Sequence, residues 1–112
     1  MSTPIRVTDR VCLVTGAGRG IGQAAARVLA AGGAKVVVAD RADSGAEVVR
    51  HIAESGGEAA FVQADVSGDA GARACVEETL RVYGQLDSLV NNAGILRLAT
   101  PLRKRPMIKY RT

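Results

Sequence analysis

Polar and apolar residues along the chain form two alternating patterns. Four short runs are apolar with almost no polar interruption, which is typical of parallel strands covered by helices on both faces. Between them, apolar residues recur at i, i+3, i+4 and i+7, the spacing of a helix with one buried side. We therefore predict strands at about 10–15, 35–40, 59–63 and 86–90, with a helix after each of the first three.

The predicted helices are bounded by capping and glycine signals. Ser44, with Glu47 three residues on, has the pattern of a capping box, and Ser67 or Asp69 is expected to cap the third helix. Glycines at 32–33, 56–57 and 84 end the three helices. The residues predicted to face the core are Ile21, Ala24, Ala25, Val28 and Leu29 in the first helix, Val48, Val49, Ile52 and Ala53 in the second, and Ala72, Cys75, Val76, Leu80 and Tyr83 in the third.

This order of elements defines an α/β fold class. Strands that alternate with helices form right-handed βαβ units and a parallel sheet. We predict a doubly wound, Rossmann-type sheet with strand order 3-2-1-4, truncated after the fourth strand. A ligand is then expected beyond the carboxyl ends of the strands, where the order reverses between the first and fourth.

Composition fits a single small domain with an aliphatic core. The chain has 112 residues, of which 47% are apolar and only 3% aromatic. Cys12 and Cys75 are expected to be small buried residues, and His51 to be a solvated helix residue without a catalytic or metal-binding role. Neither a signal-type segment nor a run of the roughly 18 apolar residues of a membrane span is found, so we expect a cytoplasmic protein without a membrane partner.

The net charge of +4 comes from the end of the chain. Residues 1–100 hold ten Lys or Arg and eleven Asp or Glu, whereas residues 101–112 hold five basic residues and no acidic one. A basic face with interleaved aromatic residues, as nucleic-acid binding requires, is missing from the body of the chain. We therefore expect no nucleic-acid partner, a folded unit over residues 1–102 and a basic tail over 103–112.

A glycine-rich turn leads directly from the first strand into the first helix. Gly16, Gly20 and Gly22 allow a tight turn and a close approach to the backbone, and the first N–H groups of the helix attract an anion. The sequence contains no Gly-Lys-Ser or Gly-Lys-Thr, which excludes the P-loop of nucleotide triphosphatases. The turn therefore predicts a phosphate site of the dinucleotide-binding kind.

Asp40 ends the second strand, 24 residues after Gly16, where a dinucleotide-binding unit carries the acid that holds the adenosine ribose. Its carboxylate can accept hydrogen bonds from ribose hydroxyls and would repel the 2′-phosphate of NADP, which favours NAD. Arg19 and Arg41 lie close enough in sequence to meet a 2′-phosphate and weaken that preference. The alternative is that Asp40 is only a turn residue that ends a strand.

Four segments in order resemble the short-chain dehydrogenase/reductase family. They are the cofactor motif Thr-Gly-Ala-Gly-Arg-Gly-Ile-Gly at 15–22, Asp40, the pair Asp65-Val66, and Leu-Asp-Ser-Leu-Val-Asn-Asn-Ala-Gly at 86–94. The resemblance implies that the glycine turn borders the pyrophosphate, Asp65 and Val66 the adenine, and residues 92–94 the inner ribose, while Thr15 and Asn91 brace the sheet. The implied cofactor-binding residues are Gly16, Gly18, Arg19, Gly20, Ile21, Asp40, Arg41, Asp65, Val66, Asn92, Ala93 and Gly94.

The resemblance also implies a function. Members of this family are NAD(P)-dependent oxidoreductases that transfer a hydride between the cofactor and an alcohol or ketone, and the full-length relatives are expected to be homo-oligomers. Their catalytic Ser and Tyr-x-x-x-Lys lie beyond the fourth strand, and no Tyr-x-x-x-Lys occurs in these 112 residues. We expect the resemblance to stop near Leu102, at a premature end or an altered reading frame, and the chain alone to be inactive.

A second hypothesis belongs to a different class of protein. Under it, the chain is a complete non-catalytic module that binds a nucleotide or nothing and uses its basic tail for an acidic partner. A Tyr-x-x-x-Lys encoded downstream, in any frame, would favour the oxidoreductase.

Overall fold

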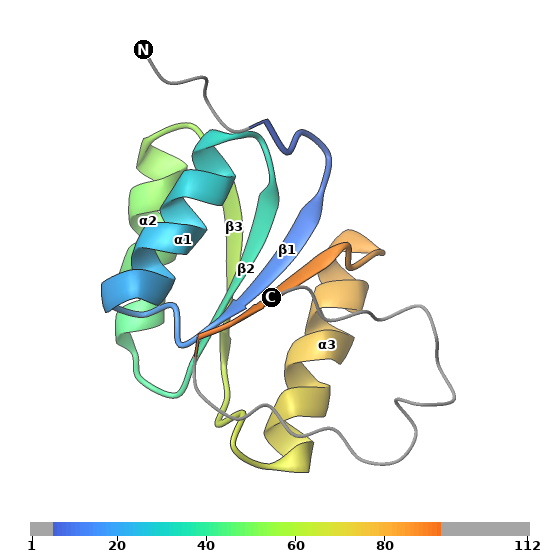
Figure 1. Cartoon of the computed structure of the whole chain (residues 1–112). Helices are drawn as coiled ribbons and strands as arrows, with labels where there is room; N and C mark the ends of the chain where they lie inside the picture. Colours follow the sequence, from blue (N-terminus) through green and yellow to red (C-terminus); the bar gives the residue numbers. More distant parts are fainter. Residues whose placement is uncertain (1–5, 93–112) are drawn as a thin grey trace.

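The computed structural model describes residues 6–92, which form one parallel sheet with helices on both faces (Figure 1). The strands lie in the order β3-β2-β1-β4, and all three strand pairs are parallel. The predicted doubly wound fold and its strand order are therefore confirmed. The elements are β1 (Val11–Thr15), α1 (Gly20–Ala31), β2 (Lys35–Asp40), α2 (Ser44–Glu54), β3 (Glu58–Gln63), α3 (Asp69–Tyr83) and β4 (Ser88–Asn91).

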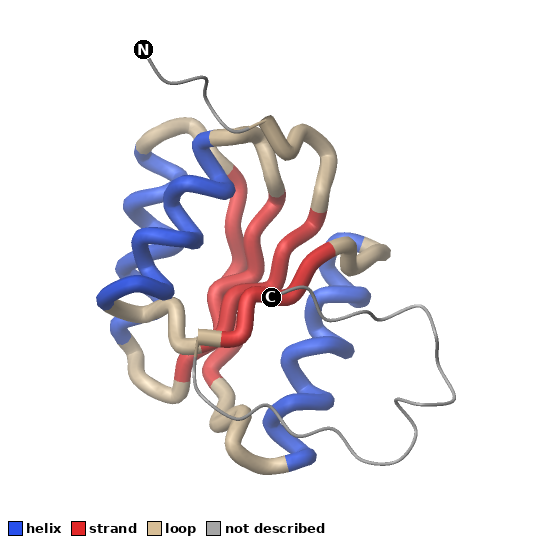
Figure 2. Tube along the Cα trace, in the orientation of Figure 1, coloured by secondary structure: helices blue, strands red, loops and turns tan. Residues whose placement is uncertain are grey.

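The two faces of the sheet carry separate cores. Helices α1 and α2 cover one face and α3 covers the other, as the tube in Figure 2 also shows. Alternate residues of one strand serve the two sides, since Cys12 and Val14 join the core under α1 and α2 whereas Leu13 joins the core under α3. This explains why Val11–Val14 of β1 and Val36–Ala39 of β2 are apolar without interruption, and why β1 is buried at every position.

Both cysteines are buried, as predicted. Cys12 lies in β1 and Cys75 in α3, and each is a free thiol. Burial raises the pKa of the Cys75 thiol to about 11, so this side chain stays protonated at neutral pH. His51 differs from expectation, because it is half-buried on α2 and its Nδ1 atom is shielded from solvent.

Helix α1 buries a different face from the predicted one. Ile21 is 79% exposed and Val28 is 49% exposed, whereas the small residues Gly22, Ala26 and Ala30 are buried. A Cβ atom at Gly22 would clash with the carbonyl oxygen of Gly16, so α1 packs against the glycine turn at the distance that glycine permits. The buried face of α1 is therefore determined by close packing of the helix against the glycine turn. The size of its apolar residues does not determine it.

The predictions for the other two buried faces are mostly right. Val48 and Ile52 of α2 are buried, as are Ala72, Cys75 and Val76 of α3. Ala53 is exposed, and Leu80 is 37% exposed while its neighbour Thr79 is fully buried. Thr79 can replace an apolar residue there because its hydroxyl donates to the carbonyl of Cys75 at 2.7 Å.

Gly32 and Gly84 end α1 and α3 as predicted, but the predicted amino-terminal caps of α2 and α3 are wrong. Ser44 is the first helical residue of α2 rather than its cap, and the N-cap, Asp43, makes no capping hydrogen bond with its side chain. Glu47 pairs with Arg50 one turn further along the helix instead of reaching back. The N-cap of α3 is Gly68, so neither Ser67 nor Asp69 caps it, and the Ser67 side chain turns to Asp65.

At the amino end of the sheet, Asp87 joins β1 to β4. Its carboxylate accepts a hydrogen bond from the N–H of Val11 at 2.8 Å, and its own N–H donates to the carbonyl of Val11 at 2.9 Å. Gln85 supports this junction by donating from Nε2 to the carbonyl of Asp9 at 3.1 Å and to the Asp87 carboxylate at 2.8 Å. Strand β4 consequently begins at Ser88, two residues later than predicted.

Within residues 6–92, no helix is both long and apolar enough to cross a membrane. The same part of the chain contains no cluster of three or more His, Cys, Asp or Glu side chains that would suit a metal ion.

Candidate dinucleotide site

A cleft of about 850 Å³ lies at the carboxyl ends of the strands. It includes nine residues predicted from the sequence to bind a cofactor: Gly16, Arg19, Gly20, Ile21, Asp40, Arg41, Asp65, Val66 and Asn92. Gly18 is buried and does not line the cleft, and Ala93 and Gly94 lie outside the described residues. The predicted positions thus come together from the ends of all four strands. The further lining residues Ala39, Ala42, Ser44, Ala64 and Ser67 were not predicted.

The glycine turn presents the start of α1 to this cleft. Gly16 and Gly20 have φ angles of +63° and +60°, a backbone conformation that glycine adopts far more readily than other residues. Arg19 is the N-cap of α1 and makes no capping hydrogen bond with its side chain. The first N–H groups of the helix therefore lack a side-chain cap, and the positive end of the helix dipole favours an anion there.

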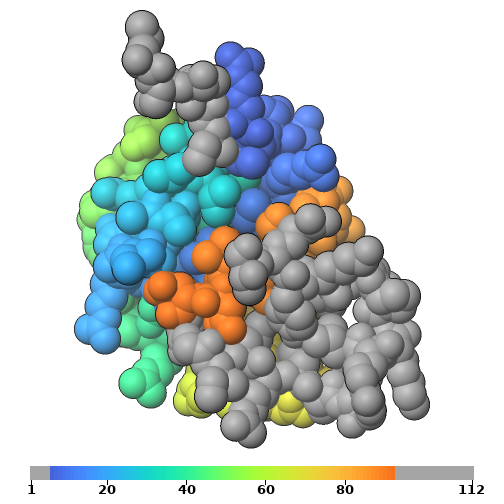
Figure 3. All heavy atoms as spheres, in the orientation of Figure 1, coloured from blue at the N-terminus to red at the C-terminus, as the bar shows by residue number. Residues whose placement is uncertain are grey.

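The ends of β1 and β4 fix the glycine turn from the other side. The hydroxyl of Thr15 donates to Asn91 Oδ1 at 3.1 Å and accepts from the N–H of Asn92 at 3.1 Å. Asn92 Nδ2 then donates to the carbonyl of Gly16 at 3.2 Å. In the space-filling view, the end of β4 accordingly lies against the first turn of α1 (Figure 3). The bracing role expected of Thr15 and Asn91 is confirmed.

Asp40 connects the end of β2 to the glycine turn. Its Oδ2 accepts a hydrogen bond from the N–H of Gly18 at 2.9 Å, and its Oδ1 accepts one from the N–H of Ala42 at 2.9 Å. A Cβ atom at Gly18 would lie only 2.8 Å from Asp40 Oδ2 and 2.5 Å from Ser44 Oγ, so a larger residue there would displace these two side chains. Asp40 is therefore a turn residue and also a cleft residue, since a carboxylate has four acceptor positions and these bonds use two of them.

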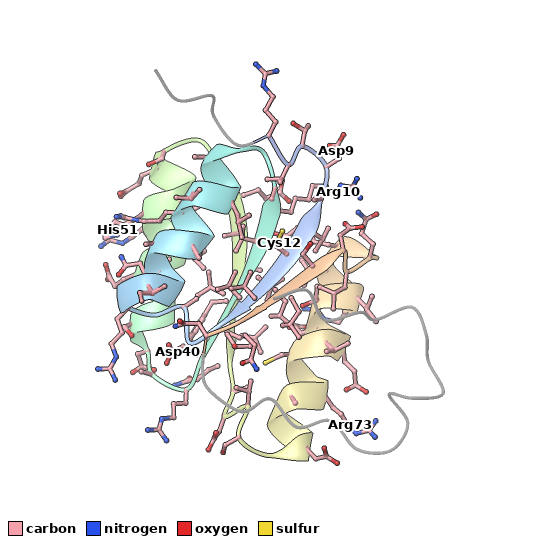
Figure 4. All side chains as sticks on the ribbon, in the orientation of Figure 1. Asp9, Arg10, Cys12, Asp40, His51 and Arg73 are labelled. Carbon is pink, nitrogen blue, oxygen red and sulfur yellow. The ribbon has the colours of Figure 1, made fainter. Side chains whose placement is uncertain are left out.

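Figure 4 shows Asp40 at the end of the sheet opposite Asp9 and Arg10. The polar groups of the cleft are thus separated from the Asp87 junction by the length of the strands. Arg19 and Arg41 are exposed at the rim of the cleft, where both line it together with Asp40. This side of the cleft therefore holds the Asp40 carboxylate and two guanidinium groups within reach of the same ligand.

Asp65 and Val66 form the third side of the cleft. The hydroxyl of Ser67 donates to Asp65 Oδ1 at 2.6 Å and the N–H of Ser67 donates to the same atom at 3.0 Å. These two bonds lower the pKa of the Asp65 carboxyl, with a further contribution from the charge of Arg41. Val66 is 6% exposed and belongs to the core under α3. The pair thus offers an ionised carboxylate beside an apolar wall.

Gln63 contacts the turn between β2 and α2, beside the cleft, and the sequence pattern did not indicate this contact. It ends β3, where alternation predicts only an exposed polar side chain. Its Nε2 donates to the carbonyl of Arg41 at 3.1 Å and to Asp43 Oδ1 at 2.9 Å. Only the pairing of β3 with β2, which sets Gln63 opposite Asp40, brings it there.

A parallel sheet of this order, with a glycine turn and an acid at adjoining strand ends, defines a Rossmann-type dinucleotide-binding unit. The model of the short chain dehydrogenase family matches residues 10–109, nearly the whole chain. The chain belongs to this family. The match also runs past Leu102, where we expected the resemblance to stop.

The curated relatives of the chain include a dehydrogenase and a reductase. The chain is 38% identical to 2,5-dichloro-2,5-cyclohexadiene-1,4-diol dehydrogenase of Sphingobium indicum, over 94% of this chain and 41% of the relative. It is 46% identical to 3-oxoacyl-(acyl-carrier-protein) reductase of a Synechocystis species, over 87% of this chain and 40% of the relative. The chain thus spans about two fifths of the length of these curated relatives.

Solved structures agree with this assignment. A short chain dehydrogenase from Mycobacterium avium superposes with a TM-score of 0.76 at 40% identity, covering 83% of this chain and 36% of the other. A 7α-hydroxysteroid dehydrogenase complexed with NADH and 7-oxo glycochenodeoxycholic acid superposes with a TM-score of 0.76 at 35% identity, covering 79% of this chain and 35% of the other.

Proposed function

We propose that these residues form the cofactor-binding part of an oxidoreductase that transfers a hydride between NAD and an alcohol or ketone. The observation that carries the proposal is the position of Asp40, which lines the cleft while its carboxylate also contacts the backbone of the glycine turn at Gly18. An acid and an anion-binding helix start on adjacent strand ends suit the adenosine ribose and the pyrophosphate of one dinucleotide. The names of the relatives, which are dehydrogenases and a reductase, support the reaction class.

Each part of the cofactor would meet a different element. The N–H groups at the start of α1 would bind the pyrophosphate beside Gly16, Gly20 and Ile21, and Asp40 would accept bonds from the adenosine ribose. Asp65 and Val66 would border the adenine, and Asn92, with Ala93 and Gly94 after it, the inner ribose. The nicotinamide ring, when bound, supplies the hydride donor or acceptor.

The preference for NAD over NADP follows from charge. The Asp40 carboxylate can accept bonds from both hydroxyls of the ribose, and charge-assisted bonds of this kind contribute roughly 1.5 to 3 kcal/mol each. The same carboxylate would repel a 2′-phosphate. Arg19 and Arg41 act in the opposite direction, so the preference is finite rather than absolute.

The remaining parts of the proposal concern the whole protein. We place it in the cytoplasm, where reducing conditions keep thiols unpaired, because Cys12 and Cys75 are both free. We further propose that the protein acts on an alcohol or ketone and that, like the homo-oligomers expected among full-length relatives, it associates with copies of itself.

Isothermal titration of the 112-residue chain with NAD and with NADP tests the proposal. NAD should bind, and it should bind more tightly than NADP. We expect both affinities to be weak, because the described residues of the cleft lie mainly where the adenosine side of the cofactor would bind. Equal or tighter binding of NADP would contradict the stated preference, and no binding of either would contradict the proposed function.

A further inference from the structure

Gln63 supports the turn that carries Asp40 without itself lining the cleft. Its side-chain amide donates to the carbonyl of Arg41 and to the carboxylate of Asp43, at 3.1 and 2.9 Å. The side chain of Gln63 is exposed, so the two bonds bury little surface. Because both acceptors belong to the turn between β2 and α2, the two bonds restrain the conformation of that turn.

The same turn is held from its other side by Asp40. Asp40 Oδ1 accepts from the N–H of Ala42, and the carbonyl of Asp40 accepts from the N–H of Ala64 at 3.0 Å. Asp40 Oδ2 then reaches the N–H of Gly18 in the glycine turn. A continuous set of hydrogen bonds thus runs from Gln63 through the turn to the phosphate-binding loop.

Two residues with opposite effects on cofactor choice lie on this turn. Asp40 disfavours a 2′-phosphate and the neighbouring Arg41 attracts one, so their relative placement determines the balance. Gln63 holds the main chain of Arg41 directly, through the Arg41 carbonyl. It holds Asp43 through the Asp43 carboxylate. It holds the backbone on both sides of Ala42, which is the residue that bonds Asp40 Oδ1.

We infer that Gln63 is a positioning residue for cofactor choice, which keeps Asp40 directed at the ribose and limits the reach of Arg41 toward a 2′-phosphate. The inference rests on the proposed function, since it concerns the same cleft. It assigns to Gln63 an effect on the ratio of two affinities, whereas a residue that only stabilises the fold would change both affinities alike.

The test compares Gln63→Met with the wild-type chain by titration with NAD and NADP. Methionine keeps the length of the side chain and removes both donors. The preference for NAD should fall by about threefold, equivalent to about 0.65 kcal/mol, which is the size of effect expected from the loss of exposed hydrogen bonds. The loss should come mainly from tighter NADP binding, as Arg41 becomes freer.

Gln85→Met is the matched control. Gln85 is also exposed, and its Nε2 also donates to a backbone carbonyl, that of Asp9, and to a carboxylate, that of Asp87. These bonds lie at the amino end of the sheet, away from the cleft. Gln85→Met should therefore leave the NAD-to-NADP ratio unchanged.

Amide hydrogen exchange gives an independent readout. The N–H groups of Ala42 and Gly18, both bonded to Asp40, should exchange at least about threefold faster in Gln63→Met. The N–H of Val37, in the middle of β2, should exchange at the wild-type rate. Gln63→Leu provides a second variant without donors if the methionine variant does not fold.

Three outcomes distinguish the proposed function from the inference about Gln63. A wild-type chain that binds neither cofactor overturns the proposed function and this inference with it. A wild-type chain that prefers NAD, with an unchanged ratio in the Gln63 variants, overturns the inference alone. An equal fall of the ratio in Gln85→Met also overturns it, because the effect would then come from general stability.

Discussion

At the scale of single residues, Asp40 has two roles that compete for one carboxylate. It accepts hydrogen bonds from the N–H groups of Gly18 and Ala42 in the free chain, and we propose that it also accepts them from ribose. The first role shapes the glycine turn and the second selects the cofactor. Both depend on the negative charge, because charged acceptors make stronger hydrogen bonds than neutral ones.

Replacement of Asp40 by Ala should reduce the preference for NAD over NADP by about tenfold, equivalent to about 1.4 kcal/mol. The change removes both the ribose acceptor and the charge that repels a 2′-phosphate. Titration of the variant with both cofactors measures the ratio. Asp69→Ala is a suitable control, since it removes a carboxylate at the start of α3 that does not line the cleft. An unchanged ratio in Asp40→Ala would mean that Asp40 is only a turn residue.

At the scale of elements, the site depends on how closely helices approach strand ends. Helix α1 meets the glycine turn through Gly22, where a Cβ would clash with the Gly16 carbonyl and lie 2.7 Å from Asn92 Nδ2. Helix α3 meets the end of β3 in a similar way, because a Cβ at Gly71 would clash with the carbonyl of Asp65. The first glycine brings the start of α1 to the cleft, and the second sets α3 against the segment that carries Asp65.

Gly22→Ala should weaken NAD binding by about tenfold or more and lower the thermal midpoint. Extra volume at a close contact typically lowers the free energy of unfolding by roughly 1–3 kcal/mol. Here it also displaces the phosphate-binding turn, which should weaken binding. Gly68→Ala is the matched control, since a Cβ there meets nothing within 4 Å. Thermal unfolding and titration of both variants check this. If Gly22→Ala bound NAD as tightly as the wild-type chain does, the glycine turn would tolerate the displacement and the prediction would be wrong.

The junction of β3 and α3 should respond to acid through Asp65. Its pKa is lowered in the folded chain by the hydroxyl and N–H of Ser67, so its bonds stabilise the fold above the unfolded pKa. That contribution is lost as pH falls through the folded value, below about pH 4. Ser67→Ala removes the hydroxyl bond to Asp65, which is the larger of the two effects on the pKa. The stability of this variant should therefore fall less than that of the wild type as the pH drops below about 4. Thermal unfolding of both chains along a pH series measures the difference, and identical acid sensitivity would contradict it.

At the scale of the whole molecule, most of the architecture could be predicted from the sequence. The unbroken apolar runs of β1 and β2 indicated strands buried on two faces, and the spacing from Gly16 to Asp40 indicated where the cleft lies. Both signals are local in the sequence. The strand order followed from them by general rules of βαβ connection.

The features that were wrong or missed depend on contacts between distant segments. The buried face of α1 is decided by Gly22 against Gly16 and Asn92, which the periodicity of the helix itself does not show. Ser67 could cap α3 or bond Asp65, and the sequence offered no means of choosing. Gln63 reaches the Asp40 turn only through strand pairing, so no motif marks it.

The central claim is that a dinucleotide binds at the carboxyl ends of the strands, across the glycine turn and Asp40. Titration of the isotope-labelled chain with NAD, followed by amide chemical shifts, tests this most directly. The account predicts that the amides of Gly18, Gly20, Ala42 and Ser67 shift and saturate together, while those of Arg10 and Gln85 at the opposite end stay constant. Shifts centred on Arg10 and Gln85, or no shift of the Gly18 and Ala42 amides at saturating NAD, would contradict it.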